Sequence, residues 1–255
     1  MGVDEALLES AEAGVSSLRF YTWSSPCLSL GYSQRMDDGM RAACDASQTG
    51  WVRRVTGGRA LLHGGDLTYT VAAPLRALPG GLNETYEKIG RVLLEALHAL
   101  GVPAEQAQPN ESGPGAEVFD CFAKPAGHEI VLGGSKLVGS AQRRTRRALL
   151  QHGSIRCNPD PSWARGATGL KGAGSTSLAQ WGEVAESDLR EALGEAFSGC
   201  LDVRLTLGEL TAEEQARAAT RGQEPEPVPV RGQATERGGP RSRGATVSSD
   251  QGDCR

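Results

Sequence analysis

The chain has 255 residues, of which 38% are hydrophobic and 23% charged, the usage of an ordinary globular protein. No apolar run approaches the roughly 18–20 residues that a membrane span requires. The segment Met1–Leu8 has no basic stretch followed by an apolar core, so we expect no secretory signal and a cytoplasmic protein. The net charge of −4 argues against a dedicated nucleic-acid binder, which would carry a basic excess.

Strands and one long helix are predicted in the first half. Short β-type runs bounded by glycine and proline predict an early sheet, and they are Leu18–Trp23, Cys27–Tyr32, Trp51–Val55 and Leu67–Ala72. From Leu82 to Leu100, apolar residues recur every three or four positions, which predicts a helix that Gly101 ends. His98 lies within this helix, and we interpret it as a structural or surface residue.

The second half predicts a further group of strands, at Glu117–Phe122, His128–Leu132, Lys136–Gln142 and Leu149–Arg156. Gly133 and Gly134 form the hairpin turn between the middle two. A helix over Ser177–Phe197, a strand over Asp202–Leu207 and a short helix opened by a capping box at Thr211 follow. Composition then turns to Gly, Pro, Arg, Gln, Ser and Glu. We therefore predict one domain over residues 1–218 and a disordered tail over residues 219–255.

The six cysteines stand at positions 27, 44, 121, 157, 200 and 254 and form no CxxC pair or metal-type cluster with the four histidines. Neither a disulfide framework nor a metal site is predicted. Free cysteine commonly acts as a small buried hydrophobe, so composition alone assigns these residues to packing.

Two basic segments stand out. In Arg53–Arg59, two adjacent glycines allow a backbone to approach a ligand closely between flanking cations, although a plain glycine loop is the alternative. Its spacing matches neither the P-loop nor the dinucleotide fingerprint. The second segment, Arg143–Arg147, is either a solvated loop or a surface that steers an acidic partner.

Several segments, in the right order, resemble the lipoate–protein ligase and octanoyltransferase superfamily. They are Asp4–Leu8, Leu18–Trp23, Leu28–Tyr32, Arg53–His63, Leu67–Thr70, Gly134–Arg143 and Leu150–Ser154. The resemblance covers roughly residues 1–215 and implies a single α/β (α+β) domain with a mixed, largely antiparallel sheet flanked by helices. Relative to the family the leading strand is missing, and the tail is atypical.

The resemblance also implies a nucleophile. Cys121 stands fifteen residues before Lys136, within Asp120–Phe122. This segment is similar to one in the octanoyltransferases that are built on a ligase-like chain, and in those proteins its cysteine carries the acyl group. Arg59 in place of a third glycine favours the same group. We therefore expect Cys121 and Lys136 to be catalytic, because a thiolate is the competent nucleophile and a neighbouring lysine favours it and can shuttle protons.

The implied reaction needs no cofactor. An octanoyl group passes from octanoyl acyl carrier protein to Cys121 and then to a lysine of a lipoyl domain, such as the glycine-cleavage H protein or a 2-oxoacid dehydrogenase acyltransferase subunit. The expected substrate-binding residues are Arg53, Arg54, Thr56, Gly57, Gly58, Arg59, His63, Gly139, Ser140 and Ala141. For His63 a positioning role and a purely structural role are equally open, whereas His128 and His152 favour a structural role.

Three other functions remain open. The first is a lipoate–protein ligase that uses ATP and magnesium. The second is an amidotransferase that moves octanoyl from the H protein to other lipoyl domains. The third is a non-catalytic module that binds acyl chains or carriers. Neither nucleic acid nor a membrane is an expected partner.

Overall fold

The computed structural model describes residues 1–107, 129–159 and 176–221. Its elements are α1 (Gly2–Glu12), β1 (Ser17–Tyr21), β2 (Cys27–Leu30), α2 (Asp38–Ala46), β3 (Gly50–Arg53), β4 (Leu61–His63), β5 (Asp66–Pro74), α3 (Leu82–Ala99), β6 (Glu105–Gln106), β7 (Ile130–Leu132), β8 (Ser135–Arg144), β9 (Ala148–Arg156), α5 (Leu178–Trp181), α6 (Glu186–Leu201) and α7 (Ala212–Arg221).

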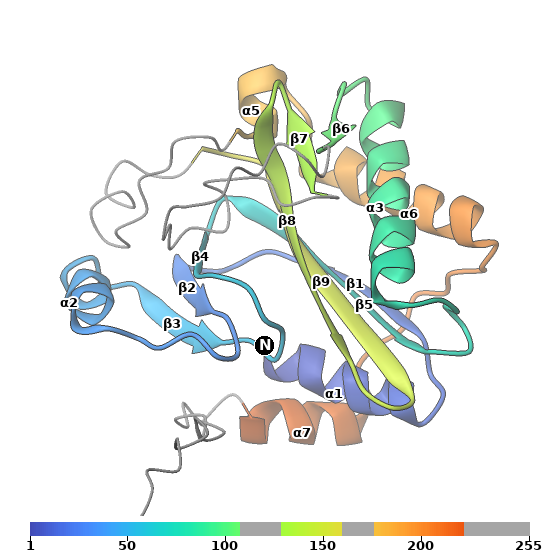
Figure 1. Cartoon of the computed structure of the whole chain (residues 1–255), viewed down its shortest axis with the longest axis horizontal. Coiled ribbons are helices and arrows are strands. Elements are labelled where there is room, and N and C mark those ends of the chain that lie inside the picture. The colour runs from blue at the N-terminus through green and yellow to red at the C-terminus, as the bar shows by residue number, and fades with distance from the viewer. Residues whose placement is uncertain (108–128, 160–175, 222–255) are drawn as a thin grey trace, which may run out of the picture.

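Two sheets form the frame (Figure 1). The large sheet has the order β1-β5-β9-β8-β7-β6, and every neighbouring pair in it is antiparallel. The small sheet has the order β3-β2-β4 and contains the parallel pair β2 and β3. The expected mixed, largely antiparallel sheet flanked by helices is therefore confirmed, although the early strands divide between the two sheets.

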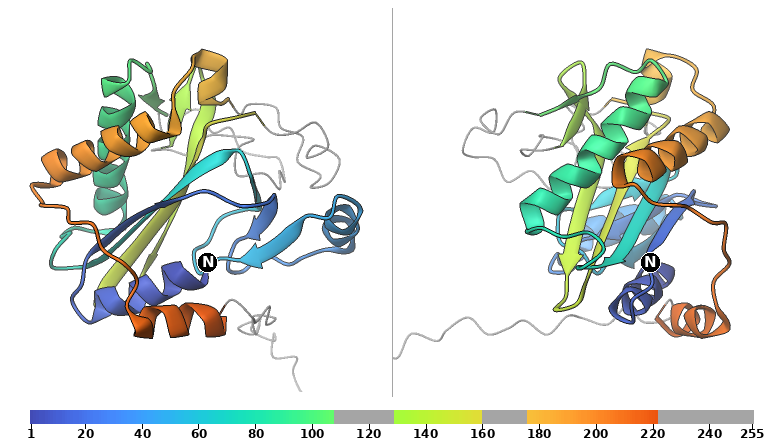
Figure 2. Two further views of the ribbon diagram at one scale, coloured as in Figure 1. Left: turned by 180° about the vertical axis from the view of Figure 1, so that it is seen from behind. Right: turned by 90° about the vertical axis from the view of Figure 1, so that its right-hand side faces the viewer.

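Helices α3 and α6 pack on one face of the large sheet (Figure 2). Their apolar stripes meet alternate side chains of the central strands, and Leu67, Tyr69, Leu93, Leu149 and Leu193 are all fully or almost fully buried in this core. Strands β5 and β9 are buried along their whole lengths, because the opposite face of the sheet is covered there as well. Burial on both sides makes these two strands the rigid centre of the fold.

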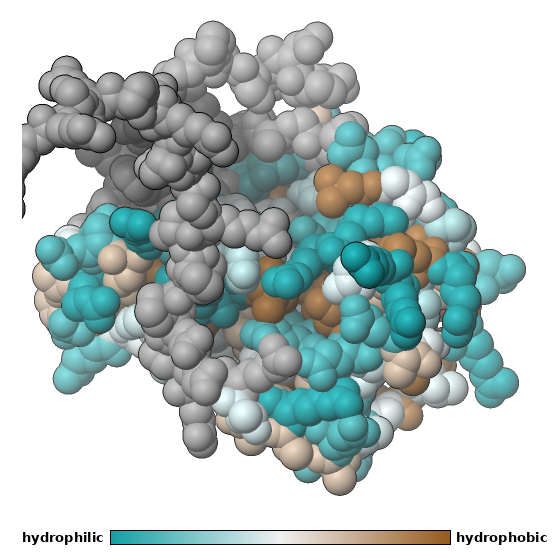
Figure 3. Space-filling model, turned by 60° about the horizontal axis from the view of Figure 1, so that its bottom comes forward, coloured by the Kyte–Doolittle hydropathy of each residue, from teal (hydrophilic) through white to brown (hydrophobic). Residues whose placement is uncertain are grey.

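On the opposite face, helix α1 packs on one end of β5 and β9, through Leu7, Leu8 and Ala11. Helix α7 lies against α1, and the Glu214 carboxylate accepts the Ser10 hydroxyl at 2.6 Å. Seen from the end that carries α1 and α7, the surface is mostly hydrophilic with small, separate apolar patches (Figure 3). The small sheet packs with α2 in a core of its own beside the large sheet (Figure 1).

The structure confirms several elements that local signals predict. The predicted helix over Leu82–Leu100 is α3, and the glycine hairpin is present, with φ of +57° at Gly133 and +75° at Gly134. The capping box is also formed, because the amide of Glu214 donates to Thr211 Oγ1 at 3.2 Å and the amide of Thr211 donates to Glu214 Oε2 at 2.8 Å.

Two expectations need correction. The helix predicted over Ser177–Phe197 is two helices, because the chain is extended at Gly182 and α6 starts afresh with an acidic first turn. The strand predicted over Asp202–Leu207 is wrong: Asp202 ends α6 in the left-handed conformation, and no described strand pairs with the residues after it. The strand predicted at Glu117–Phe122 lies outside the described residues.

Candidate active site

The candidate site is the face of the large sheet that lies opposite α3 and α6. Side chains of a strand alternate between faces, and the register Gly139↔Ser154 and Ala141↔His152 places these four residues on one side of β8 and β9. The segment from Thr56 to Arg59, which we call the glycine loop, lies on this same side of the sheet. The Thr56 hydroxyl and the His152 ring are in hydrogen-bond contact at 2.6 Å.

A β-bulge brings Lys136 to this face. Ile130 of β7 pairs with Val138 of β8, but the next residue, Val131, pairs with Lys136, so Leu137 is an extra residue on β8. Leu137 and Val138 both belong to the core under α3 and α6. Because a bulge shifts the side-chain alternation by one, Lys136 points to the opposite face. It therefore shares the candidate site with Gly139 and Ala141.

The Lys136 ammonium forms an ion pair with the carboxylate of Glu129. The two side chains are only 3% and 10% exposed. Two main-chain hydrogen bonds fix the surroundings: the Glu129 carbonyl accepts the amide of Ala107 at 2.7 Å, and the Lys136 carbonyl accepts the amide of Thr176 at 3.1 Å. A buried ammonium needs such a carboxylate, since an unpaired charge would be expensive to bury. Glu129 was missed from the sequence, where it is a single acidic residue ahead of an apolar strand.

Arg54 braces the glycine loop from within, and Arg53 braces the segment that follows β2. Arg54 is buried and donates to the carbonyls of Ser29 at 3.0 Å, Gly57 at 3.0 Å and Arg59 at 2.6 Å. Arg53 donates to the carbonyl of Gly31 at 3.0 Å. Both guanidinium groups thus hold main-chain carbonyl groups. Arg54 thereby fixes the shape of the glycine loop.

The exposed part of the loop is the short stretch from Gly57 to Arg59. Gly58 has a φ of +92°, which favours glycine. The loop also presses on the end of β2: a Cβ on Gly31 would lie 1.9 Å from the Gly58 carbonyl oxygen, so a side chain is excluded there. The close approach that the structure shows here is between two segments of the protein, whereas the predicted approach of the paired glycines to a ligand stays a prediction.

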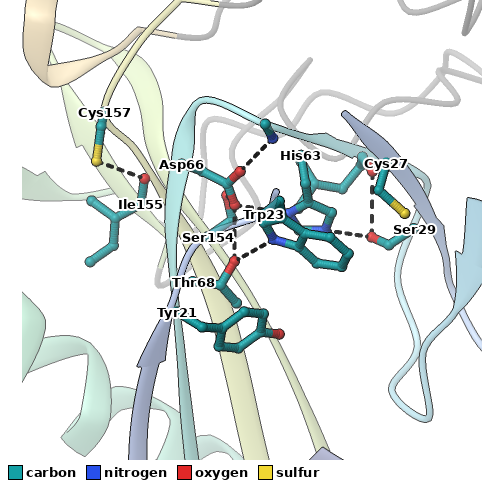
Figure 4. A network of polar contacts seen from close by, with 12 residues as sticks. Tyr21, Trp23, Cys27, Ser29, His63, Asp66, Thr68, Ser154, Ile155 and Cys157 are labelled. Carbon is teal, nitrogen blue, oxygen red and sulfur yellow. Dashed lines mark hydrogen bonds and ion pairs between the residues drawn. The ribbon is translucent and has the colours of Figure 1, made fainter. Parts of the chain in front are cut away.

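His63 stands at the centre of a buried polar network (Figure 4). Its Nδ1 lies 2.8 Å from Asp66 Oδ2 and its Nε2 lies 2.8 Å from Ser29 Oγ. The indole of Trp23 stacks on the ring at a centroid distance of 4.2 Å. The same carboxylate accepts the hydroxyls of Thr68 at 3.0 Å and Ser154 at 2.7 Å, which joins β4, β5 and β9.

Electrostatics in this network favour an ionised aspartate and a neutral histidine. Burial raises the pKa of Asp66, but hydrogen bonds from His63, the amide of Gly64 and Ser154 outweigh it and bring the pKa to about 2. Burial lowers the pKa of His63 despite the neighbouring carboxylate. His63 is therefore built into the protein through both ring nitrogens, and it can position the loop that precedes it.

The remaining predicted residues of β8 divide between the two faces. Gly139 and Ala141 face the site. Ser140 points toward α3, where its hydroxyl contacts Tyr69 Oη at 2.7 Å and its carbonyl accepts the Tyr86 hydroxyl at 3.1 Å. A direct side-chain contact of Ser140 with a ligand on the site face is thus not supported by the geometry, although its main chain lies in the same strand.

The arginines from 143 to 147 do not form one patch. Arg143 reaches the site side, donating to the Val55 carbonyl at 3.0 Å and lying over the Tyr32 ring. Arg144 points the other way, to Thr85 Oγ1 at 3.0 Å. Arg146 is exposed in the hairpin tip, ten residues from Lys136 and hence about 30 Å along the strand. Of these arginines, Arg143 is the best placed to act on the site.

Burial makes three of the described cysteines poor nucleophiles. Burial raises the pKa of Cys27 and of Cys157 to about 11, and it raises the pKa of Cys44 as well. Cys27 and Cys157 stand on opposite sides of the His63 network (Figure 4). Cys200 lies in α6, on the other face of the large sheet. Cys121, like His128, lies outside the described residues.

Within the described ranges, no three His, Cys, Asp or Glu side chains gather as metal ligands. In the same part of the chain, no helix is both long and apolar enough to cross a bilayer. His98, as expected, serves structure: its Nε2 contacts the Ala104 carbonyl at 2.7 Å at the surface end of α3.

The mixed, largely antiparallel sheet with helices on both faces defines a single α/β (α+β) domain, and its polar side chains gather on one face of the large sheet. The family model described as the lipoyl protein ligase A/B catalytic domain matches residues 1–198. The chain belongs to this family, as the sequence motifs predicted.

Relatives and solved structures agree with this assignment. The chain is 37% identical over 241 residues to octanoyltransferase LipM of Kyrpidia tusciae, covering 86% of this chain and 88% of that protein. It is 36% identical over 241 residues to octanoyltransferase LipM of Symbiobacterium thermophilum, with the same coverage. A crystal structure of lipoate-protein ligase A bound with ATP superposes with a TM-score of 0.72 at 22% identity, over 86% of each chain. That likeness concerns the fold.

Proposed function

We propose that this chain transfers an octanoyl group from octanoyl acyl carrier protein, through a thioester on Cys121, to a lysine of lipoyl-domain proteins in lipoate biosynthesis. The observation that carries the proposal is the similarity to two proteins named octanoyltransferase, each over 86% of this chain. The raised pKa values of Cys27, Cys44 and Cys157 support Cys121 as the nucleophile, because these thiols are less readily ionised.

The proposed transfer takes place in two steps. The Cys121 sulfur attacks the thioester carbonyl, a new carbon–sulfur bond forms, and the carrier thiol departs with the proton that Cys121 lost. The substrate amine then attacks the octanoyl-cysteine, an amide forms, and the thiol of Cys121 is restored with a proton from the amine. Lys136 is the proposed hydrogen-bond donor and proton carrier, and main-chain amides of the glycine loop or of residues 139–141 are the proposed oxyanion donors.

The test is mass spectrometry of the intact protein after mixing with octanoyl acyl carrier protein in the absence of nucleotide. We expect the wild type to gain one octanoyl group and Cys121→Ser to lose the thioester label. Cys157→Ser is the matched control and should still be labelled. Labelling of the Cys121→Ser variant at another cysteine would refute the assignment.

The ATP-dependent ligase remains the second candidate, because the fold is shared with a lipoate-protein ligase bound with ATP. Adenylate formation from free lipoate with ATP and magnesium, without loading of Cys121, would favour it. A panel of donors that includes octanoylated H protein separates the acyl carrier route from the amidotransferase route. A folded protein that is loaded by no donor would be a binding module.

A further inference from the structure

The glycine loop is tied to the large sheet through one buried threonine. Thr56 is 1% exposed, and the Gly57, Gly58 and Arg59 that follow it are exposed. The Thr56 carbonyl accepts the amide of Tyr32 at 2.8 Å, which fixes the main chain of the loop on its β2 side. The Thr56 side chain points the opposite way, into the sheet.

Beneath the loop, the Thr56 hydroxyl meets a His–Asp pair. His152 Nε2 lies 2.6 Å from Thr56 Oγ1, and His152 Nδ1 lies 2.9 Å from Asp4 Oδ2. His152 is 4% exposed and Asp4 is fully buried. The hydrogen-bonded chain therefore runs from α1 through β9 to the loop, joining positions 4, 152 and 56, which belong to three separate sequence motifs.

The charge of Asp4 decides the direction of these hydrogen bonds. Burial raises the pKa of Asp4, but the hydrogen bond and charge of His152 and the charge of Arg19 contribute to bringing it to about 2, so the carboxylate is ionised. It accepts the proton of His152 Nδ1. Whenever the ring carries only this proton, Nε2 is the acceptor and the Thr56 hydroxyl donates to it.

The carboxylate itself is held from two strands. Asp4 Oδ1 accepts the Thr70 hydroxyl of β5 at 3.0 Å and Arg19 Nη1 of β1 at 3.0 Å. The Tyr21 hydroxyl lies 3.3 Å from Oδ2. With its partners fixed on the rigid centre of the fold, Asp4 sets the plane of the His152 ring, and the ring sets the position of Thr56.

From this geometry we infer that Asp4 and His152 are positioning residues for the glycine loop, and that they act on the reaction through Thr56. The inference rests on the proposed function, because the loop amides are its proposed contact with the acyl donor. Loss of the Thr56 anchor lets Gly57 and Gly58 move, and displacement of positioned groups by about 1 Å can cost on the order of 100-fold in rate.

Two pairs of matched variants test it. Thr56→Val removes the hydroxyl at constant shape, whereas Thr56→Ser keeps it. His152→Gln places an amide oxygen near the former Nε2 and keeps an acceptor for Thr56, whereas His152→Asn reaches only to the former Nδ1. Thr49→Val controls for the loss of a buried threonine hydroxyl, since Thr49 Oγ1 accepts the Ser47 hydroxyl at 2.9 Å near the end of α2.

We expect kcat for octanoyl transfer to fall about 10- to 100-fold in Thr56→Val and His152→Asn, with KM changed less than about threefold. Thr56→Ser and His152→Gln should each recover most of that loss, because they keep the hydroxyl or its acceptor, and the control Thr49→Val should stay within about threefold of the wild type in kcat. NMR order parameters provide a readout that needs no activity: those of Gly57 and Gly58 should drop from about 0.85 toward 0.6 in the two damaging variants alone.

Two results would overturn the inference. One is a Thr56→Val or His152→Asn protein whose loop order parameters match the wild type. The other is a loss of kcat that follows thermal stability equally across all five variants, which is the signature of a purely structural role. If the wild type transfers no octanoyl group, the proposed function fails, while the order parameters still decide whether His152 positions the loop through Thr56.

Discussion

Breaking the ion pair between Glu129 and Lys136 should separate its structural role from its chemical role. Because both side chains are nearly buried, removing one partner leaves the other charge without this counter-ion, at a cost of about 3–5 kcal/mol in the free energy of unfolding. Glu129→Gln and Lys136→Met should each lose about 3 kcal/mol. Glu129→Leu combined with Lys136→Met replaces the pair by apolar groups of similar size and should lie within about 1 kcal/mol of the wild type.

Urea unfolding followed by circular dichroism measures these free energies, with a constant m value as the check on two-state behaviour. Glu87→Gln is the control, because the Arg91–Glu87 pair on α3 is 72% and 34% exposed and should contribute at most about 1 kcal/mol. The stable double variant should still show no octanoyl transfer, since it lacks the lysine. Single variants that each cost less than about 1 kcal/mol, or a double variant as unstable as their sum, would refute the buried pair.

Two further predictions concern the strands beneath the site. Gly153→Ala should cost about 1–3 kcal/mol in the free energy of unfolding measured in urea, because the new methyl would lie 2.5 Å from Tyr69 Cε1 and 2.8 Å from the Gly139 carbonyl oxygen. The control Gly194→Ala has open space on α6 and should be neutral or gain up to about 1 kcal/mol. Equal effects of the two substitutions would contradict the crowding at Gly153. The pKa of Asp66 falls from 3.8 to about 2 on folding, so the folded state gains about 2 kcal/mol that is present above pH 4 and lost as the pH falls through 2. Between pH 5 and pH 2 the wild type should therefore lose about 2 kcal/mol more than Asp66→Asn in urea titrations, and parallel curves would show that the carboxylate is not held in this way.

Much of the fold can be predicted from local signals in the sequence. The helix over Leu82–Leu100, the Gly133–Gly134 hairpin and the capping box at Thr211 depend on contacts within a few residues, so composition and spacing suffice to predict them. The strand expected at Asp202–Leu207 failed for the complementary reason. Its alternating apolar residues favour a strand, but a strand forms only where another offers its edge, and that partner is a property of the whole fold.

The site shows the same division. The buried partners Glu129 and Ser29 were missed, because each meets its lysine or histidine across a pair of strands. Asp66 was missed although it lies only three residues after His63, because its spacing alone does not show that the turn between them folds the two side chains together. The bulge at Leu137 is a sharper case: one extra residue turns Lys136 from the core to the site, and regular alternation along β8 would have placed it on the wrong side. The sequence pattern there is irregular, but it does not say which residue is the extra one.

The two buried His–Asp pairs flank the glycine loop, one through Ser29 and one through Thr56. In both pairs the aspartate is ionised and its remaining hydrogen bonds come from neighbouring strands. A buried polar network that is fully satisfied stabilises one arrangement strongly, whereas a partly satisfied one is costly. The loop is therefore held from both sides by buried groups, and several of these groups lie in the motifs that identify the family. We expect contact with the proposed acyl donor to fall to a few exposed groups, among which are the amides of Gly57 and Gly58.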